Sequence, residues 1–194
     1  MLIMSFINHS SIYKAIKFPI PPLKEQQKIA DILSTVDSQI DDTDKLIEKT
    51  KELKKGLMQR LLTKGIGHSE FKKSEVGEIP VEWEVKELNN ISTIVDSLHE
   101  TPNYVDSGYS MIRVVDVNGK AINTDSAFKV TEETYLKFIR KYEPQSGDII
   151  MSRVGSYGLV SYLKDNEKVC LGQNIVVITT KLMDKSFLFS YSSI

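Results

Sequence analysis

The longest uninterrupted helical pattern in the sequence lies between Leu23 and Thr63, and it constrains the fold more than any other feature. No Gly or Pro interrupts this stretch before Gly56, and Gly65 follows its end. Residues 19–22, PIPP, favour extended backbone and suit a helix that begins directly after them. A helix of this length would extend roughly 60 Å at about 1.5 Å per residue, far more than an ordinary globular helix.

Apolar side chains recur along this stretch at alternating steps of four and three residues. Such a heptad spacing is typical of a coiled coil and requires burial against another helix. No second segment of the chain has a comparable length and period, so the partner helix is expected outside the chain. The predicted pairing residues are Ile29, Leu33, Val36, Ile40, Ile47, Leu57 and Leu61.

Charge is distributed unevenly, although the formal net charge is -1. Residues 1–64 carry 11 basic and 8 acidic side chains, and the remainder carries 14 and 18. Lysines accumulate in the second half of the helical stretch, where they suit the helix dipole. The whole-chain balance gives no indication of a nucleic-acid partner.

Composition excludes several classes of protein. With 41% hydrophobic and 26% charged residues, the chain is expected to be globular and not disordered. A single cysteine, Cys170, excludes an internal disulfide framework, and its apolar surroundings predict a buried strand position. No apolar run approaches the roughly 20 residues of a membrane-spanning helix. Residues 1–7 lack the features of a signal peptide, so the expected compartment is the cytoplasm.

Motifs for catalysis and for cofactor binding are missing from the sequence. Neither a phosphate-binding loop nor a dinucleotide-binding glycine pattern occurs. The three histidines have no partner at metal-ligand spacing. We therefore expect no metal, no cofactor and no catalytic residue in this chain.

The segment 80–194 is predicted to be a mixed α and β domain, joined to the helix by a polar linker over 65–79. Runs rich in Val, Ile, Tyr and Thr predict its strands. The predicted strands are 91–95, 111–117, 148–153, 159–163 and 175–179.

A short helix is predicted after Thr131, a candidate N-cap followed by two acidic residues. Pro144 is expected to end it. Its predicted apolar face consists of Tyr135, Leu136, Ile139 and Tyr142. The apolar end of the chain, residues 187–194, is expected to begin a further element.

Two loops of this segment carry side chains that can contact DNA. Residues 147–158 predict a buried strand and a glycine-bounded turn that displays Arg153, Ser156 and Tyr157. The amide of Gln173 could contact adenine. The alternative is an ordinary hairpin with a solvated arginine, and the sequence alone favours it, because basic loop residues are common.

Four segments together resemble a known family, the specificity subunit of type I restriction–modification enzymes. The order of the matching segments is that of the family over about residues 18–180. The first three are IPPLKEQQKIA (20–30), KGLMQRLLTKGI (55–66) and IPVEWE (79–84), and the fourth is GDII (147–150) with Gly155 and Gly158.

The resemblance implies an α+β fold with a long coiled-coil spacer helix followed by a target-recognition domain. It also implies a DNA-recognition subunit that has no catalysis of its own. The family docks methyltransferase and endonuclease subunits on a bipartite site, and S-adenosylmethionine, ATP and magnesium belong to those partners. Two spacer helices of the family pack antiparallel and set the distance between the two half-sites.

Compared with the family, the sequence is expected to be a piece of a specificity subunit. It would comprise a remnant of a preceding recognition domain (1–22), the spacer helix (23–64), the linker (65–79) and an incomplete recognition domain (80–194). A gene fragment, a silent recombination cassette and a half-subunit that forms a homodimer through its helix all agree with this organisation. The candidate DNA-contacting residues are Arg113, Lys120, Lys129, Arg153, Ser156, Tyr157 and Gln173.

Two alternatives remain open on the sequence. The first is a coiled-coil interaction fragment that does not bind DNA, which the acidic balance of residues 65–194 favours. The second is an independent enzyme, a nuclease or a methyltransferase, against which the missing motifs count.

Overall fold

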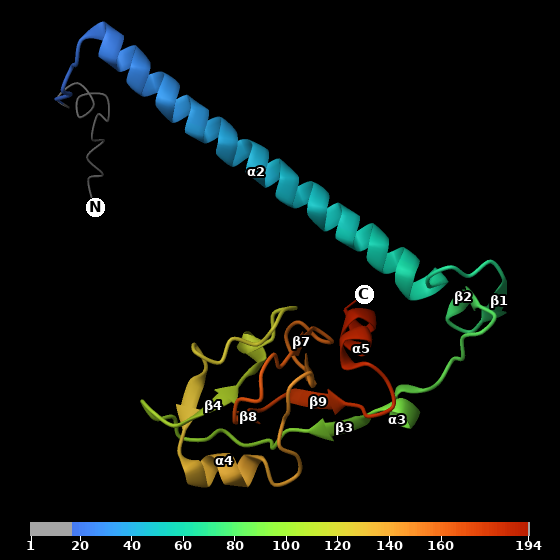
Figure 1. The fold of residues 1–194 in the computed structure, drawn as a ribbon. Helices are drawn as coiled ribbons and strands as arrows, with labels where there is room; N and C mark the ends of the chain where they lie inside the picture. Colours follow the sequence, from blue (N-terminus) through green and yellow to red (C-terminus); the bar gives the residue numbers. More distant parts are fainter. Residues whose placement is uncertain (1–16, 194) are drawn as a thin grey trace, which may run out of the picture. The chain divides into compact units, whose positions relative to one another are not determined.

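The computed structural model describes residues 17–193, so most of the predicted remnant over 1–22 lies outside the described residues. Figure 1 shows a long helix, α2, and a mixed α and β domain. The chain divides into two compact units, and the boundary falls within α2, between Lys55 and Gly56. The predicted α+β fold class, with a long helix in front of the sheets, is confirmed.

Helix α2 (Leu23–Lys64) has 42 residues, within one residue of the helix that the apolar spacing predicts. At its start, the Glu25 amide donates to the carbonyl of Pro22 at 2.8 Å, because proline fixes the backbone of the first turn. At its end, Gly65 adopts a φ of 65°, and its amide donates to the carbonyl of Leu61. A positive φ at this position is the usual glycine termination of a helix.

A β-hairpin follows the helix within the stretch 65–79, which was expected to be a polar linker. Strand β1 (Phe71–Ser74) pairs antiparallel with β2 (Gly77–Pro80). The ammonium group of Lys64 lies 4.6 Å from the centre of the Phe71 ring, so the hairpin contacts the last residue of the helix. The sequence signal is weak here because each strand has only four residues and half of them are exposed.

Four antiparallel strands form the larger sheet, in the order β3-β9-β6-β7. They are β3 (Thr93–Asp96), β9 (Ile175–Thr179), β6 (Ile149–Ser152) and β7 (Val160–Tyr162). The predicted strand over 175–179 has the bounds of β9. The strands predicted over 148–153 and 159–163 each extend one residue beyond β6 and β7 at both ends.

A second sheet has the order β5-β4-β8. In it, β4 (Tyr109–Ile112) pairs antiparallel with β5 (Phe128–Val130) and parallel with β8 (Val169–Leu171). The prediction that Cys170 is buried in a strand is confirmed, because its side chain in β8 is fully buried. Strands β8 and β9 follow one another closely in the chain and carry it from this sheet into the larger one (Figure 1).

The core of the domain contains apolar residues of both sheets. Ile112 and Val169 of the smaller sheet and Ile150 and Val177 of the larger one belong to a single buried cluster. The two sheets therefore bury their apolar residues together in one core.

Two predicted strands differ from the observed elements. The strand expected over 91–95 begins only at Thr93, because the preceding residues form the single-turn helix α3 (Leu88–Ile91). The strand expected over 111–117 ends at Ile112, and the 3-10 turn η1 (Val114–Asp116) follows it. There the Asp116 carboxylate accepts a hydrogen bond from the Arg113 amide at 2.8 Å, which favours a turn over a continued strand.

Helix α4 (Glu132–Phe138) begins as predicted. The Thr131 hydroxyl accepts a hydrogen bond from the Thr134 amide at 3.3 Å, as an N-cap does. The expected extension to Pro144 and the expected apolar face are wrong in part. The helix ends at Phe138, which is buried, whereas Leu136 is 53% exposed.

The apolar end of the chain forms helix α5 (Lys185–Ser192), in agreement with the expected further element. The Asp184 carboxylate caps it by accepting a hydrogen bond from the Phe187 amide at 2.8 Å. An ion pair joins its first residue to the larger sheet, because Lys185 Nζ lies 2.7 Å from a carboxylate oxygen of the fully buried Asp148.

Candidate nucleic-acid interface

Several strands of the two sheets end at the same edge of the domain. Strands β3 and β6 both run antiparallel to β9, and their last residues, Asp96 and Ser152, pair with the start of β9. The parallel strands β4 and β8 end beside them, because the Gly172 amide donates to the carbonyl of Ile112 at 2.8 Å just before β9 begins. Polar side chains follow these strand ends. We call this surface the polar edge, and it comprises Asp96, Thr101, Arg113, Arg153 and Gln173.

Arg153 lies at the polar edge directly after β6. Its Nη1 forms an ion pair with Asp96 Oδ1 at 2.7 Å, and its amide donates to the carbonyl of Asn174 at 2.8 Å. Asn174 itself has a φ of 61°, which is unusual for a residue with a side chain and fixes the chain direction before β9. The arginine is thus positioned by two other loops and is still half exposed.

The predicted glycine-bounded turn follows Arg153 and connects β6 with β7. Gly155 and Gly158 have φ values of 68° and 80°, which glycine adopts without strain. The Ser152 hydroxyl donates to the carbonyl of Ser156 and holds the turn closed. The side chain of Tyr157 is 81% exposed at the tip, where its ring and hydroxyl are free to contact a ligand.

Arg113 lies directly after β4. Its guanidinium group stacks over the Phe128 ring, with its carbon 3.6 Å from the ring centre. The Asp116 carboxylate accepts from the Arg113 backbone amide and lies 3.4 Å from its Nε. The Tyr104 ring packs against the Phe128 ring in a T-shaped arrangement, so a small aromatic cluster fixes the plane of the guanidinium group.

Gln173 lies beside Arg113, in a groove with a volume of about 240 Å³. Its Nε2 donates to the Thr101 hydroxyl at 2.7 Å, and Val115, which is largely exposed, also lines the groove. The groove thus places a guanidinium group, an amide and an apolar side chain together. This combination can donate and accept hydrogen bonds at base edges and contact a thymine methyl group.

Five of the seven predicted DNA-contacting residues therefore lie at the polar edge or in the turn next to it: Arg113, Arg153, Ser156, Tyr157 and Gln173. Lys129 and Lys120 do not. Lys129 pairs with Ser110 near the start of β4, and its ammonium group donates to the Ser110 hydroxyl and the Thr124 carbonyl. Lys120 is exposed in a loop. Its backbone carbonyl accepts a hydrogen bond from the Tyr162 amide, and Tyr162 pairs with the first residue of β6.

Sequence reasoning missed the residues that hold the arginines at this edge. Asp96 lies 57 residues before Arg153, and Phe128 lies 15 residues after Arg113. No spacing rule connects such positions, because the strand pairing alone brings them together. Asp116 had a local signal, since a carboxylate three residues after Arg113 suits a turn.

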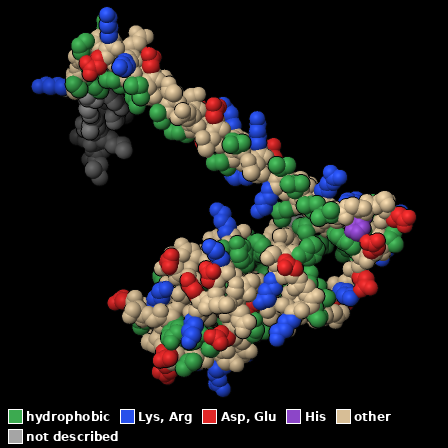
Figure 2. Space-filling model, viewed as in Figure 1, with side chains coloured by type: hydrophobic (Ala, Val, Ile, Leu, Met, Phe, Trp, Pro, Cys, Tyr) green, Lys and Arg blue, Asp and Glu red, His purple; other side chains and the backbone are tan. Residues whose placement is uncertain are grey.

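The apolar face of helix α2 is a second candidate interface. All seven predicted pairing residues are exposed, from 40% for Leu61 to 59% for Leu33. Figure 2 shows hydrophobic side chains spaced along the helix between charged ones. An exposed apolar stripe of this kind is the surface that a partner helix would bury.

Neither a metal cluster nor a membrane span is found in the part of the chain that the structure describes. No three His, Cys, Asp or Glu side chains of residues 17–193 lie together as metal ligands would. None of its helices is both long and apolar enough to cross a bilayer. Burial raises the pKa of the Cys170 thiol to about 12, so this thiol is protonated at neutral pH.

Comparisons with known proteins agree with this fold. The fold, a long helix with a mixed domain whose strand ends carry polar side chains, is that of a DNA specificity domain. The family model of the type I restriction modification DNA specificity domain matches residues 8–53 and 80–194, and the chain belongs to this family.

Two curated relatives illustrate the similarity. The chain is 34% identical over 187 residues to the type I restriction enzyme MjaVIII specificity subunit of Methanocaldococcus jannaschii, covering 92% of this chain and 44% of that protein. It is 25% identical over 177 residues to the EcoBI specificity subunit of Escherichia coli, covering 83% of this chain and 37% of that protein. The chain thus spans less than half the length of these relatives.

Among solved structures, the HsdS subunit from Thermoanaerobacter tengcongensis has the same fold. The TM-score is 0.52 at 16% identity, and the match covers 91% of this chain and 42% of that one. A second structure, from a study of complex assembly in the type I R-M system, gives a TM-score of 0.50 at the same identity. These structural matches confirm the fold, and the family model and the curated relatives confirm the resemblance inferred from the sequence motifs.

Proposed function

We propose that this chain recognises a DNA sequence through its polar edge, as the specificity component of a type I restriction–modification complex. The observation that carries the proposal is that two arginines and a glutamine from three different loops lie at one edge of a rigid sheet. Arg113, Arg153 and Gln173 are each held by a neighbouring side chain, so their donors have fixed directions.

The residue types at the polar edge suit base recognition in the major groove. A guanidinium group donates two hydrogen bonds to guanine, and a glutamine amide pairs with adenine. Exposed Val115 and Tyr157 add apolar and stacking contacts. Because Arg113 and Arg153 are paired with Asp116 and Asp96, the edge contributes directional hydrogen bonds more than net positive charge.

We propose further that helix α2 pairs antiparallel with a second helix of the same kind, in a second copy of this chain. Residues 23–44 carry six acidic and two basic side chains, a net charge of -4. Residues 45–64 carry seven basic and two acidic ones, a net charge of +5. Antiparallel pairing places each acidic half against a basic half, whereas parallel pairing opposes like charges.

This pairing would give a bipartite recognition unit. Two domains at opposite ends of a paired helix read two half-sites, and the helix length sets the distance between them. The same unit docks methyltransferase and endonuclease subunits, which bring S-adenosylmethionine, ATP and magnesium, and it works with them on DNA in the cytoplasm. In this arrangement the chain itself performs no catalysis.

One observation favours a second function, a helix-pairing protein that does not bind DNA. Residues 65–194 carry 18 acidic and 14 basic side chains, and the arginines of the polar edge are already paired with carboxylates. In this case α2 would bind the partner helix, and the polar edge would remain solvated.

A mobility-shift experiment separates the two functions. The full chain is mixed with labelled duplexes, with and without the methyltransferase subunit, at increasing salt. The proposal predicts a shift for specific duplexes, with an affinity that falls as the salt concentration rises, because contacts to phosphates release counterions. Equal shifts for all duplexes, or affinity that is unchanged between low and moderate salt, would contradict sequence recognition.

A further inference from the structure

A pocket at the opposite ends of strands β3 and β9 has no role in the proposed function. Its volume is about 610 Å³, within the range of small-molecule sites. It is lined by the first residue of β3, Thr93, and by the last residue of β9, Thr179. The polar edge begins at the other end of these strands, about 13 Å away along β9.

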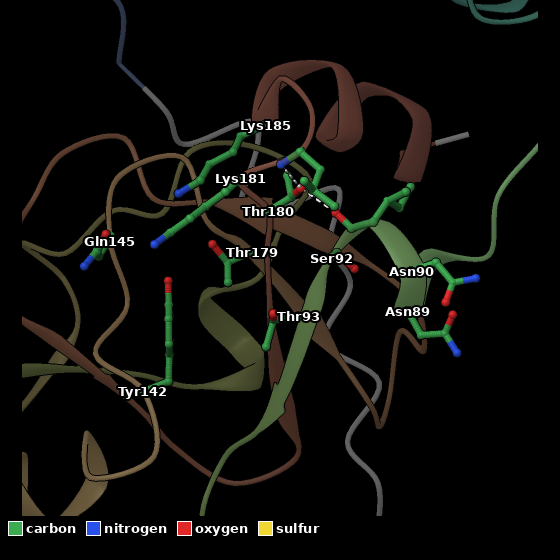
Figure 3. Close-up of a pocket in the computed structure, with 12 residues that line it drawn as sticks. Asn89, Asn90, Ser92, Thr93, Tyr142, Gln145, Thr179, Thr180, Lys181 and Lys185 are labelled. Atoms are coloured by element: carbon green, nitrogen blue, oxygen red, sulfur yellow. Dashed lines mark hydrogen bonds between the residues drawn. The ribbon is translucent and has the colours of Figure 1, made fainter. Parts of the chain in front are cut away.

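The polar ends of five side chains converge at one side of this pocket (Figure 3). They belong to Tyr142, Gln145, Thr179, Lys181 and Lys185. The other labelled amides, Asn89 and Asn90, point away from this group (Figure 3). Two ammonium groups, an amide and two hydroxyls thus surround one part of the pocket with polar groups.

Within this group, Lys185 is held in position by two hydrogen bonds. Its ammonium donates to Asp148 Oδ1 at 2.7 Å and to the Ser146 carbonyl at 3.1 Å, which leaves one of its three N–H donors for the pocket. The other carboxylate oxygen of Asp148 accepts from the Tyr142 hydroxyl at 2.6 Å and from the backbone amide of Gln145 at 2.8 Å. The negative charge of the buried Asp148 carboxylate is therefore compensated by the neighbouring groups that donate to it.

Lys181 is free to bind a ligand. It is exposed, and no ion pair within residues 17–193 includes it. The loop that carries it is fixed at Thr180, whose hydroxyl donates to the Ile91 carbonyl and accepts from the Leu182 amide at 3.0 Å. Because Lys185 is neutralised by Asp148, Lys181 leaves a net positive charge at the convergent side of the pocket.

We propose that this pocket binds the phosphate group of a small phosphate monoester, with Lys181, Lys185 and Thr179 as the donors. An anion with several acceptor oxygens is the ligand that convergent ammonium and hydroxyl donors recognise. The pocket is larger than a phosphate group, and its remaining lining of Ile91, Thr93 and Leu182 would contact the uncharged part of the ligand.

Calorimetric titration of the full chain with inorganic phosphate and with AMP, at constant ionic strength, tests the proposal. We expect saturable binding of both and about tenfold weaker binding to Lys181→Ala, the loss of one charge-assisted contact. Thr179→Val should weaken binding by a smaller factor. Lys168→Ala removes an exposed lysine outside the pocket and should bind as the unaltered chain does.

Absence of saturable binding, or equal binding to Lys181→Ala and the unaltered chain, would overturn the proposal. A competition experiment distinguishes the two possible sources of the phosphate group, a small molecule and the DNA backbone. Saturating AMP should leave duplex binding at the polar edge unchanged, and Arg153→Ala should leave AMP affinity unchanged. Displacement of duplex by AMP would show that the pocket holds the DNA backbone, and the small-molecule proposal would be wrong. If the chain binds AMP but does not bind duplex, only the proposed function would be contradicted.

Discussion

Arg153 and Asp96 form an ion pair between the ends of strands β6 and β3, with Nη1 2.7 Å from Oδ1. The two residues are separated by 57 positions in the chain and meet because both strands flank β9. Both side chains remain about half exposed. The pair therefore contributes little to stability, about 1 kcal/mol or less, and its main effect is to orient the guanidinium group.

Substitution of Arg153 should impair DNA recognition and leave the fold intact. We expect Arg153→Ala to weaken binding of the specific duplex by about 1–3 kcal/mol, the usual cost of a lost base contact. The free energy of unfolding should change by no more than about 1 kcal/mol, the contribution of an exposed ion pair. Fluorescence anisotropy and urea denaturation measure the two quantities. An equal loss for specific and random duplexes would instead assign Arg153 to phosphate contact.

Substitution on the apolar face of α2 should disrupt helix pairing. Ile40→Asp places a charge at the centre of the predicted seam and should convert a dimer into a monomer in sedimentation equilibrium. Ser38→Asp is the matched control, because position 38 lies on the outer face of the heptad between Val36 and Ile40. A chain that is monomeric without substitution, or a dimer that survives Ile40→Asp, would contradict pairing through this face.

The local parts of the fold could be predicted from the sequence, because they depend on spacing and capping within one segment. Helix α2, the N-cap Thr131 and strand β9 are examples. Strand β5 and the hairpin β1-β2 could not, because short strands are defined by their pairing partners and not by their own residues. The end of β4 was missed because the Asp116 carboxylate binds the backbone there.

The candidate site divides in the same way. The turn that carries Ser156 and Tyr157 was predictable from its glycines. Its proximity to Gln173 and Arg113 was not, because only the passage of the chain from β8 into β9 brings these loops together. Lys129 was a candidate by residue type, but strand pairing places its ammonium group on Ser110 and Thr124.

Loss of the buried Asp148 charge should destabilise the domain. Asp148→Asn leaves the ammonium of Lys185 without its carboxylate, and we expect a loss of about 2–4 kcal/mol in the free energy of unfolding. Asp165→Asn, at an exposed position, is the control and should change stability by less than about 0.5 kcal/mol. Chemical denaturation of both variants measures the difference. Equal stability of the two would contradict a structural role for the pair.

The thiol of Cys170 should be unreactive in the folded protein. Burial raises its pKa from 9.0 to about 12, so the reactive thiolate is scarce at pH 8. We expect slow reaction with a disulfide reagent in native buffer and rapid reaction in guanidinium chloride. Because the folded state holds the proton more tightly, this group stabilises the fold below pH 9, and its contribution is lost as the pH rises toward 12. Rapid reaction of the native protein at pH 8 would show that β8 opens readily.

Selection of binding sites from a random duplex library tests the central claim most directly. The full chain is used together with the methyltransferase subunit, in parallel with Arg113→Ala, Arg153→Ala and Gln173→Ala. The account predicts an enriched sequence for the unaltered chain and, for each variant, relaxed preference at particular positions of that sequence. No enriched sequence, or the same sequence at full strength for all three variants, would contradict recognition through the polar edge.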